Sequence, residues 1–213
     1  MIVLHHAAQS RSFRILWFLR EAGLEHRLVR HSFAGKALRD PGFLAISPAG
    51  RVPVVEVDGG TLFESGAILQ YLCETRAPAL GRAPGSAERG KYLEWLHYGE
   101  TLAQHLAQLT FHRVVLPPAD RSPVVQKLES LRLRRALQGV EAALASGALV
   151  PGGFSAADIM VGASVDLARR FVRLDGLPRV ADWHAGLRAR PGFQAALAAD
   201  GEAELYRQEY YGD

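Results

Sequence analysis

The stretch that decides the fold reads Arg51-Val52-Pro53-Val54-Val55-Glu56-Val57-Asp58-Gly59-Gly60-Thr61-Leu62-Phe63-Glu64-Ser65. Residues 52–57 are rich in β-branched side chains, which favour a strand. The Asp-Gly-Gly turn that follows predicts that the next three residues return antiparallel as the second strand of a hairpin. Ser65 can cap a helix, which the Ala77-Pro78 step ends. A hairpin followed by a helix is predicted.

The residues before the hairpin predict a βαβ unit. The apolar run 2–4 suits a buried strand, and apolar residues at helical spacing follow it up to Ala22. Leu28 and Val29 begin a second extended stretch, and 34–47 is an irregular or partly helical connection. The order βαβ, connection, ββα is that of a thioredoxin-like domain.

The second half of the chain carries helical patterns without convincing strands. Residues 77–87 are rich in proline and glycine, which is typical of a linker. We therefore expect an α/β thioredoxin-like domain over 1–76, a linker over 77–87 and an all-α helical bundle over 88–213. The expected helices run over about 88–115, 122–145, 156–172, 179–190 and 192–199.

Composition excludes several classes of protein. The 213 residues are 48% hydrophobic with a net charge of +3, and they contain no basic block typical of a nucleic-acid arm. No stretch approaches about 18 consecutive apolar residues, so no membrane contact is expected. The single cysteine, Cys73, lies in an apolar helix and fits a reducing compartment, which favours a cytoplasmic protein. The histidines form no tight ligand motif, and we expect no metal.

Three polar segments are candidates for chemistry, and each has a plainer interpretation. Ser10 and Ser12 stand where the first helix begins, so its free N–H groups could stabilise an anion such as a thiolate, or these serines could merely cap the helix. Pro53 could follow a cis bond that exposes the main chain of Val52, or it could be a trans edge-strand proline.

Glu64 and Ser65 form the third segment. The carboxylate could receive an ammonium group while Ser65 and the helix N-terminus receive a carboxylate. These are the two ends of an α-amino acid. A simple helix cap accounts for the same two residues equally well.

Taken together, these segments resemble the glutathione site of the glutathione S-transferase family, particularly its theta-like, bacterial and fungal serine-type members. The segments 10–17, 51–53 and 64–65 occur in the family's order and spacing. Residues 155–159 resemble its helix-capping box, and 92–98 resemble its first long helix. The resemblance covers essentially the whole chain.

The resemblance implies a role for each segment. Ser10 would be the catalytic serine that activates the thiol of the co-substrate glutathione. Pro53 would be cis, the main chain of Val52 would pair with the cysteinyl unit, and Arg51 would approach the glycyl carboxylate. Glu64 and Ser65 would hold the γ-glutamyl end. Lys36 stands in a connection that often adds a cation, although its local spacing departs from the family's.

The resemblance also implies an activity: attack of the glutathione thiolate on an apolar electrophile, with peroxide reduction or dehalogenation as side activities. Tyr98, Thr101 and His105 recur at helical spacing and could line the electrophile pocket, or they could form a packed helix face. The family further implies a homodimer, and no nucleic-acid partner is expected. A non-catalytic binding or scaffold protein of the same fold is the alternative.

Overall fold

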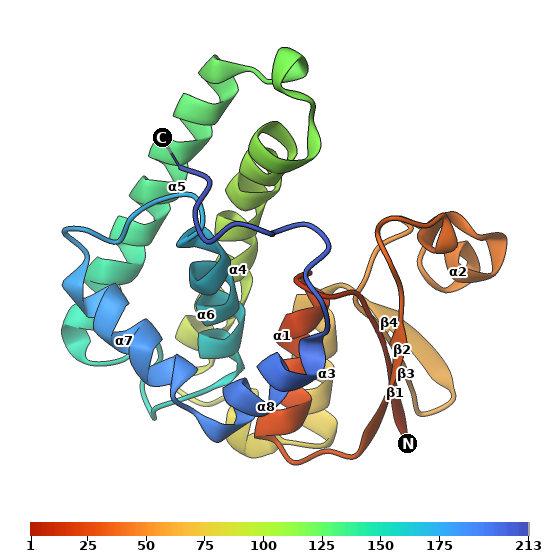
Figure 1. Cartoon of the computed structure of the whole chain (residues 1–213). Coiled ribbons are helices and arrows are strands. Elements are labelled where there is room, and N and C mark those ends of the chain that lie inside the picture. Colours follow the sequence, from red (N-terminus) through yellow and green to blue (C-terminus); the bar gives the residue numbers. More distant parts are fainter. Residues whose placement is uncertain (213) are drawn as a thin grey trace. The chain divides into compact units, whose positions relative to one another are not determined.

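The structure, a computed structural model, describes residues 1–212 and contains a four-stranded sheet with helices around it (Figure 1). The strand order is β2-β1-β3-β4. β1 and β2 are parallel, and the β1–β3 and β3–β4 pairs are antiparallel. The strands are β1 (Ile2–His6), β2 (His26–Arg30), β3 (Val54–Val57) and β4 (Gly60–Phe63). The predicted hairpin and βαβ unit are confirmed.

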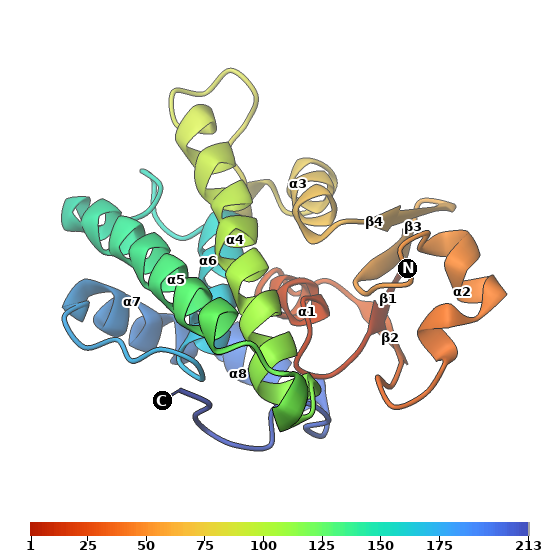
Figure 2. The ribbon, with the colours of Figure 1, turned by 90° about the horizontal axis from the view of Figure 1, so that it is seen from above.

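Helices cover both faces of this sheet. α1 (Ser12–Glu21) and α3 (Ser65–Thr75) lie on one face, and the short α2 (Pro41–Ile46) lies on the other (Figures 1 and 2). All residues of β1 are buried, which explains why this strand reads as a continuous apolar run. The sheet and its helices form the predicted thioredoxin-like domain.

The chain divides into two compact units. The first comprises Met1–Gly81 and Ala189–Glu204, and the second comprises Arg82–Arg188 and the residues from Leu205 onward. The expected boundaries at 77–87 stay a prediction, but one difference is clear. α8 (Pro191–Asp200), which was expected in the helical domain, belongs to the first unit.

α8 packs on α1 through aromatic and backbone contacts. The Phe193 ring meets the Trp17 ring edge to face, with centroids 4.9 Å apart. A Cβ atom added at Gly192 would come within 2.8 Å of the Glu21 Cα, so glycine permits this close approach. Burial of these side chains, which no local pattern encodes, accounts for the place of α8.

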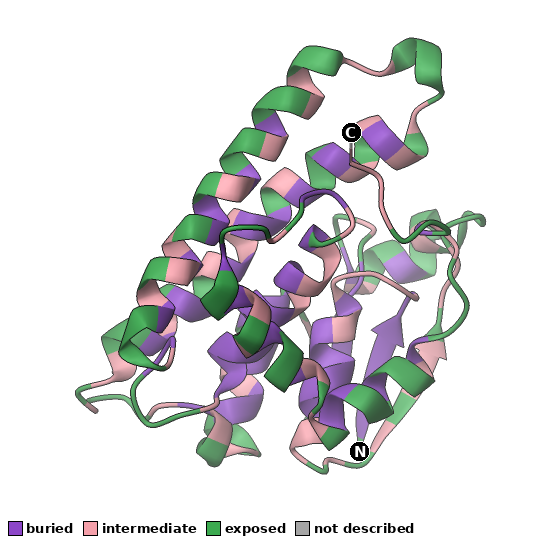
Figure 3. Cartoon of the chain, turned by 60° about the vertical axis from the view of Figure 1, so that its left-hand side comes forward, coloured by how far each residue is buried: buried purple, intermediate pink, exposed green. Residues whose placement is uncertain are grey.

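The second unit is helical. Its helices are α4 (Arg89–Thr110), α5 (Pro123–Ala143), α6 (Ala156–Ala168) and α7 (Pro178–Arg188). α4 continues as one π-helical turn, and short 3₁₀ turns occur at Ala37–Arg39, Pro78–Leu80, Pro118–Asp120 and Leu144–Ser146. α6 is buried along most of its length and packs on α4 (Figure 3). A mostly helical second half was predicted.

Two local features stabilise these helices. Ser155 and Asp158 form the predicted capping box at the start of α6, with the Ser155 N–H donating to the Asp158 carboxylate at 2.9 Å. Between α4 and α6, a Cβ atom at Gly99 would meet the Met160 main chain at 3.0 Å.

Within residues 1–212, no helix is both long and apolar enough to cross a membrane.

Candidate functional site

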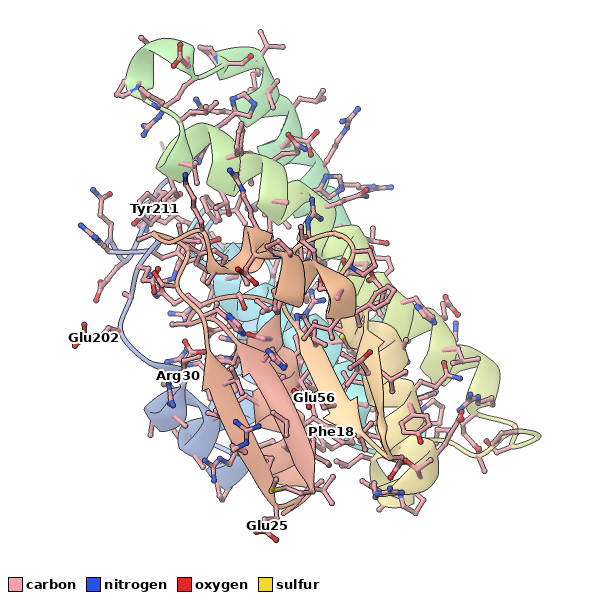
Figure 4. The ribbon with its side chains drawn as sticks, turned by 90° about the vertical axis from the view of Figure 1, so that its right-hand side faces the viewer. Phe18, Glu25, Arg30, Glu56, Glu202 and Tyr211 are labelled. Atoms are coloured by element: carbon pink, nitrogen blue, oxygen red, sulfur yellow. The ribbon has the colours of Figure 1, made fainter. Side chains whose placement is uncertain are left out.

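The three candidate segments meet at one end of the sheet. The strand register places His5 opposite Val54, and Val54 opposite Phe63. The loop after β1, the residues before β3 and those after β4 therefore leave the sheet at the same end. In Figure 4, Glu25, which precedes β2, marks the opposite end. Residues more than 50 positions apart in the sequence thus lie close enough to form one site.

The Val52–Pro53 peptide bond is cis, as the resemblance implied. Both residues are buried, whereas Arg51 is exposed beside them. Ser47 holds the Arg51 main chain, since its hydroxyl donates to the Arg51 carbonyl at 2.8 Å and accepts its N–H at 3.1 Å. Val52 precedes the last strand pair, so its main chain extends beyond the ladder.

Glu64 has an unusual backbone conformation. Its φ of +71° is positive, which a side chain other than glycine rarely adopts. Such strain costs on the order of 1–3 kcal/mol and is concentrated at ligand sites. The exposed Glu64 carboxylate lies at the N-terminus of α3, next to the buried Ser65.

Arg14 is a residue that the sequence reasoning missed. This guanidinium lies 3% exposed on α1, and its Nη1 donates to the Ser65 hydroxyl at 2.9 Å. It adds a positive charge to the N-terminus of α3, where an anion is already favoured. An arginine within the apolar run of 13–19 was the available signal for a buried charge.

Ser10 lies in the turn between β1 and α1, half-buried. Its hydroxyl oxygen accepts the main-chain N–H of Ser12, the first residue of α1, at 3.1 Å, but the N-cap of α1 is Arg11, so Ser10 is not the helix cap. The same oxygen is 2.6 Å from the Ser12 hydroxyl. Gln9, with φ of +58°, shapes this turn. Lys36 is exposed on the connection after β2, at the same end of the sheet.

Tyr98, Thr101 and His105 line one groove, of about 580 Å³, between α4 and α5 of the second unit. The Tyr98 hydroxyl donates to the Ala136 carbonyl at 3.0 Å, and burial raises the pKa of Tyr98. Arg132 and Arg135 also line the groove.

The acid beside this groove is Glu129, whose carboxylate is 2.6 Å from His105 Nδ1 and 2.7 Å from Arg132. Burial, the largest influence, raises the pKa of Glu129, but the contacts with His105 and Arg132 outweigh it. The pKa of Glu129 is therefore below its ordinary value. The polar groups of this groove bind one another across two helices.

Cys73 lies in α3 with 2% of its surface exposed, so it is a core residue rather than an accessible nucleophile. Among the described residues, no group of three or more His, Cys, Asp or Glu side chains could hold a metal ion. The candidate chemistry therefore centres on the end of the sheet in the first unit.

The fold and this site define a protein with a thioredoxin-like domain and a helical partner unit. The family model "Glutathione S-transferase, N-terminal domain" matches residues 1–74. Glutathione S-transferase GstA of Escherichia coli O157:H7 is 31% identical over 194 residues, which cover 86% of this chain and 90% of that protein. The chain therefore belongs to the glutathione S-transferase family.

Other proteins and a solved structure are also similar to this chain. Disulfide-bond oxidoreductase YfcG of Escherichia coli K12 is 30% identical over 211 residues, 92% of this chain and 94% of that protein. A match to glutathione S-transferase 3 of Schizosaccharomyces pombe, 39% identical over 102 residues, spans only 41% of that relative. The theta-class enzyme of Xanthomonas axonopodis pv. citri, solved with glutathione bound, superposes with a TM-score of 0.83 at 29% identity, covering 92% of this chain and 96% of that one.

Proposed function

We propose that this protein is a glutathione transferase that binds glutathione at the end of the sheet and activates its thiol beside Ser10. The observation that carries the proposal is the convergence of three segments there, each offering the group that one part of glutathione requires. Family membership supports glutathione transfer as the general activity. The particular contacts and the second substrate are part of the proposal.

Each part of the tripeptide has a proposed partner. The Val52 main chain, beyond the strand ladder, pairs with the cysteinyl unit. Glu64 receives the γ-glutamyl ammonium, while Ser65 and the N-terminus of α3 receive its carboxylate, a position that the Arg14 charge also favours. Arg51 approaches the glycyl carboxylate, and Lys36 adds a cation from the connection.

The energy required for activation is modest. A thiol of pKa near 8.5 is only a few per cent ionised at pH 7, and lowering its pKa by two units needs about 2.7 kcal/mol. One hydrogen bond to a charged acceptor contributes roughly 1.5–3 kcal/mol. The N-terminus of α1 adds about 0.3–1 kcal/mol. Ser10 and α1 together can therefore supply a lowering of this size.

We propose an apolar electrophile as the second substrate, with peroxide reduction or dehalogenation as side activities of the same thiolate. Tyr98, Thr101 and His105 are proposed to contribute to its binding, supported by their shared groove. Because two arginines also line that groove, electrophiles that join an apolar body to an acidic group should be tested first. A cytoplasmic homodimer completes the proposal, and a sizing measurement tests the dimer.

A second candidate activity is disulfide exchange, which the similarity to YfcG favours. In that reaction the bound thiolate attacks a disulfide, forms a mixed disulfide with one sulfur and releases the other as a thiolate. Glutathione itself would supply the nucleophile, because Cys73 is buried. The same site therefore serves both activities, and the scaffold alternative predicts neither.

The test is the ultraviolet thiolate absorbance of bound glutathione, followed against pH. We expect Ser10→Ala to bind glutathione while the pKa of the bound thiol rises by about one to two units, since one charge-assisted hydrogen bond is lost. Ser146→Ala, which removes an exposed hydroxyl bonded to main-chain carbonyls in the second unit, serves as the matched control. Unchanged ionisation in Ser10→Ala would refute the role of Ser10, and binding without ionisation in the wild type would favour the scaffold alternative.

A further inference from the structure

A buried chain of polar contacts runs inward from Ser10. The Ser12 hydroxyl is 2.6 Å from the Ser10 hydroxyl and 2.8 Å from Nδ1 of His6. Nε2 of His6 lies 2.8 Å from the main-chain carbonyl of Asp200, the last residue of α8. His6 and Ser12 are fully buried. All four residues belong to the first unit.

The acceptors in this chain determine where its protons lie. The Asp200 carbonyl can only accept, so Nε2 of His6 carries a hydrogen. In neutral His6, Nδ1 is then an acceptor, and the Ser12 hydroxyl donates to it at 2.8 Å in preference to the Ala7 carbonyl at 3.2 Å. The Ser12 oxygen therefore accepts, and the Ser10 hydroxyl donates inward to Ser12.

In this arrangement the Ser10 hydroxyl cannot donate its hydrogen to a glutathione thiolate. A hydroxyl has one hydrogen, so Ser10 can donate to a thiolate only if it stops donating to Ser12. The chain stays fully bonded only if every hydrogen bond reverses: His6 Nδ1 donates to Ser12, Ser12 to Ser10, and Ser10 to the sulfur. The reversed chain needs one additional proton, on Nδ1 of His6.

We propose that the glutathione thiol itself supplies this proton, and that Ser12, His6 and Asp200 are positioning residues that carry and hold it. This inference rests on the proposed function. The S–H bond breaks and an O–H bond forms on Ser10, whose own proton passes to Ser12. The Ser12 proton passes to Nδ1 of His6. One S–H bond is exchanged for one N–H bond, and no electrons are transferred.

The surroundings of His6 suit the charged imidazole that results. The Asp200 Oδ2 atom accepts the Gln9 N–H at 2.9 Å, whereas Oδ1 is buried, lacks a hydrogen-bond partner among the described residues and lies 3.4 Å from Nε2 of His6. The carboxylate thus faces the imidazole without another hydrogen bond on that oxygen. A charge on His6 would be compensated there.

The other charged or titratable neighbours of His6 are Arg30, His31 and His5. Arg30, the partner of His6 on β2, donates to the Ala199 carbonyl at 2.8 Å and is exposed, so solvent screens its charge. His31, which follows β2, donates its N–H to the His6 carbonyl, and burial, followed by His5 and His6, lowers the pKa of His31. The charged form of His31 is therefore disfavoured. His5 points to the other face of the sheet, because successive strand residues alternate, and contacts Glu56 there at 2.8 Å.

His6→Gln is the main test, because glutamine keeps a donor toward the Asp200 carbonyl but cannot take up a proton. We expect His6→Gln to bind glutathione within about threefold of the wild type while the ratio of bound thiolate to bound thiol at pH 7 falls about tenfold, equivalent to one pKa unit. Ser12→Ala, which interrupts the hydrogen-bond chain, should lower thiolate formation by the same amount as His6→Gln. Asp200→Asn should give a smaller fall. His5→Gln is the matched control and should behave as the wild type.

A proton count separates the relay from a purely structural role. Calorimetry of glutathione binding in buffers of different ionisation enthalpy gives the protons released. The wild type should form thiolate at pH 7 with almost no proton released to the buffer, because His6 takes up the proton that the thiol loses.

Each contrary outcome has a distinct meaning. A full proton released by the wild type at pH 7 would overturn the relay and leave the proposed function intact. Thiolate retained by both His6→Gln and Ser12→Ala would do the same. Wild type that binds no glutathione, or binds it without thiolate, would overturn the proposed function and the relay together. Should His6→Gln fail to fold, Ser12→Ala and Asp200→Asn decide.

Discussion

The two units use their polar side chains differently. In the first unit, buried polar contacts join residues far apart in the sequence, such as His6 with Asp200 and Arg14 with Ser65, and these contacts meet at one end of the sheet. In the second unit, polar contacts hold helices in place: the Ser155 capping box starts α6, the Ser164 hydroxyl donates to the Gly99 carbonyl of α4, and His105 contacts Glu129 between α4 and α5. Substitutions at the end of the sheet should therefore report on thiolate formation, and those at the buried helix contacts of the second unit on stability.

We expect the largest change in the free energy of unfolding at Gly99, in the second unit. Gly99→Ala places a methyl group 3.0 Å from the Met160 main chain, and such overpacking costs about 1–3 kcal/mol in the free energy of unfolding. Gly90→Ala on the same helix, where nothing lies within 4 Å, should be neutral or slightly stabilising. Urea unfolding measures both. Equal effects of the two variants would show that α4 and α6 do not approach this closely.

Asp158→Ala should have the next largest effect. The variant loses the hydrogen bonds from Ser155 and from Trp183 Nε1, which we expect to cost about 1–2 kcal/mol. The exposed Asp182→Ala on α7 is the control. Thermal unfolding gives the loss, and the thiolate absorbance of bound glutathione should not change. A shifted thiol pKa in Asp158→Ala would contradict the proposal that this contact of the second unit affects stability and not thiolate formation.

Asp166→Asn should have the smallest effect, with a clear dependence on pH. Burial raises the pKa of Asp166, but the contact with His184 at 3.1 Å and the charge of Arg188 outweigh it, so the pKa is lowered. An acid with a lowered folded-state pKa stabilises the protein above its ordinary pKa, and this contribution is lost as pH falls through the lowered value. Asp166→Asn should cost about 1 kcal/mol at pH 7. Urea unfolding at several pH values should show that cost disappearing as the pH falls through the lowered pKa of Asp166; a cost independent of pH would contradict the assignment.

Much of the fold was predictable because its signals are local. The β-branched run before a glycine turn, the helix starts at Ser65 and Ser155, and the breaks near Pro117 are each encoded within a few residues. The ends of the predicted strands also located Ser10, Pro53 and Glu64. These signals depend on backbone conformations that the residues themselves favour.

The tertiary structure decided which distant residues meet. Asp200 reaches His6 because α8 packs on α1 rather than within the helical unit, and Arg14 reaches Ser65 because α1 and α3 share one face of the sheet. Such pairings follow from burying apolar surface between helices, which is not directional and therefore has no signature in local spacing. The sequence by itself determined the elements and the segments of the proposed glutathione site, whereas packing determined the buried polar contacts behind Ser10.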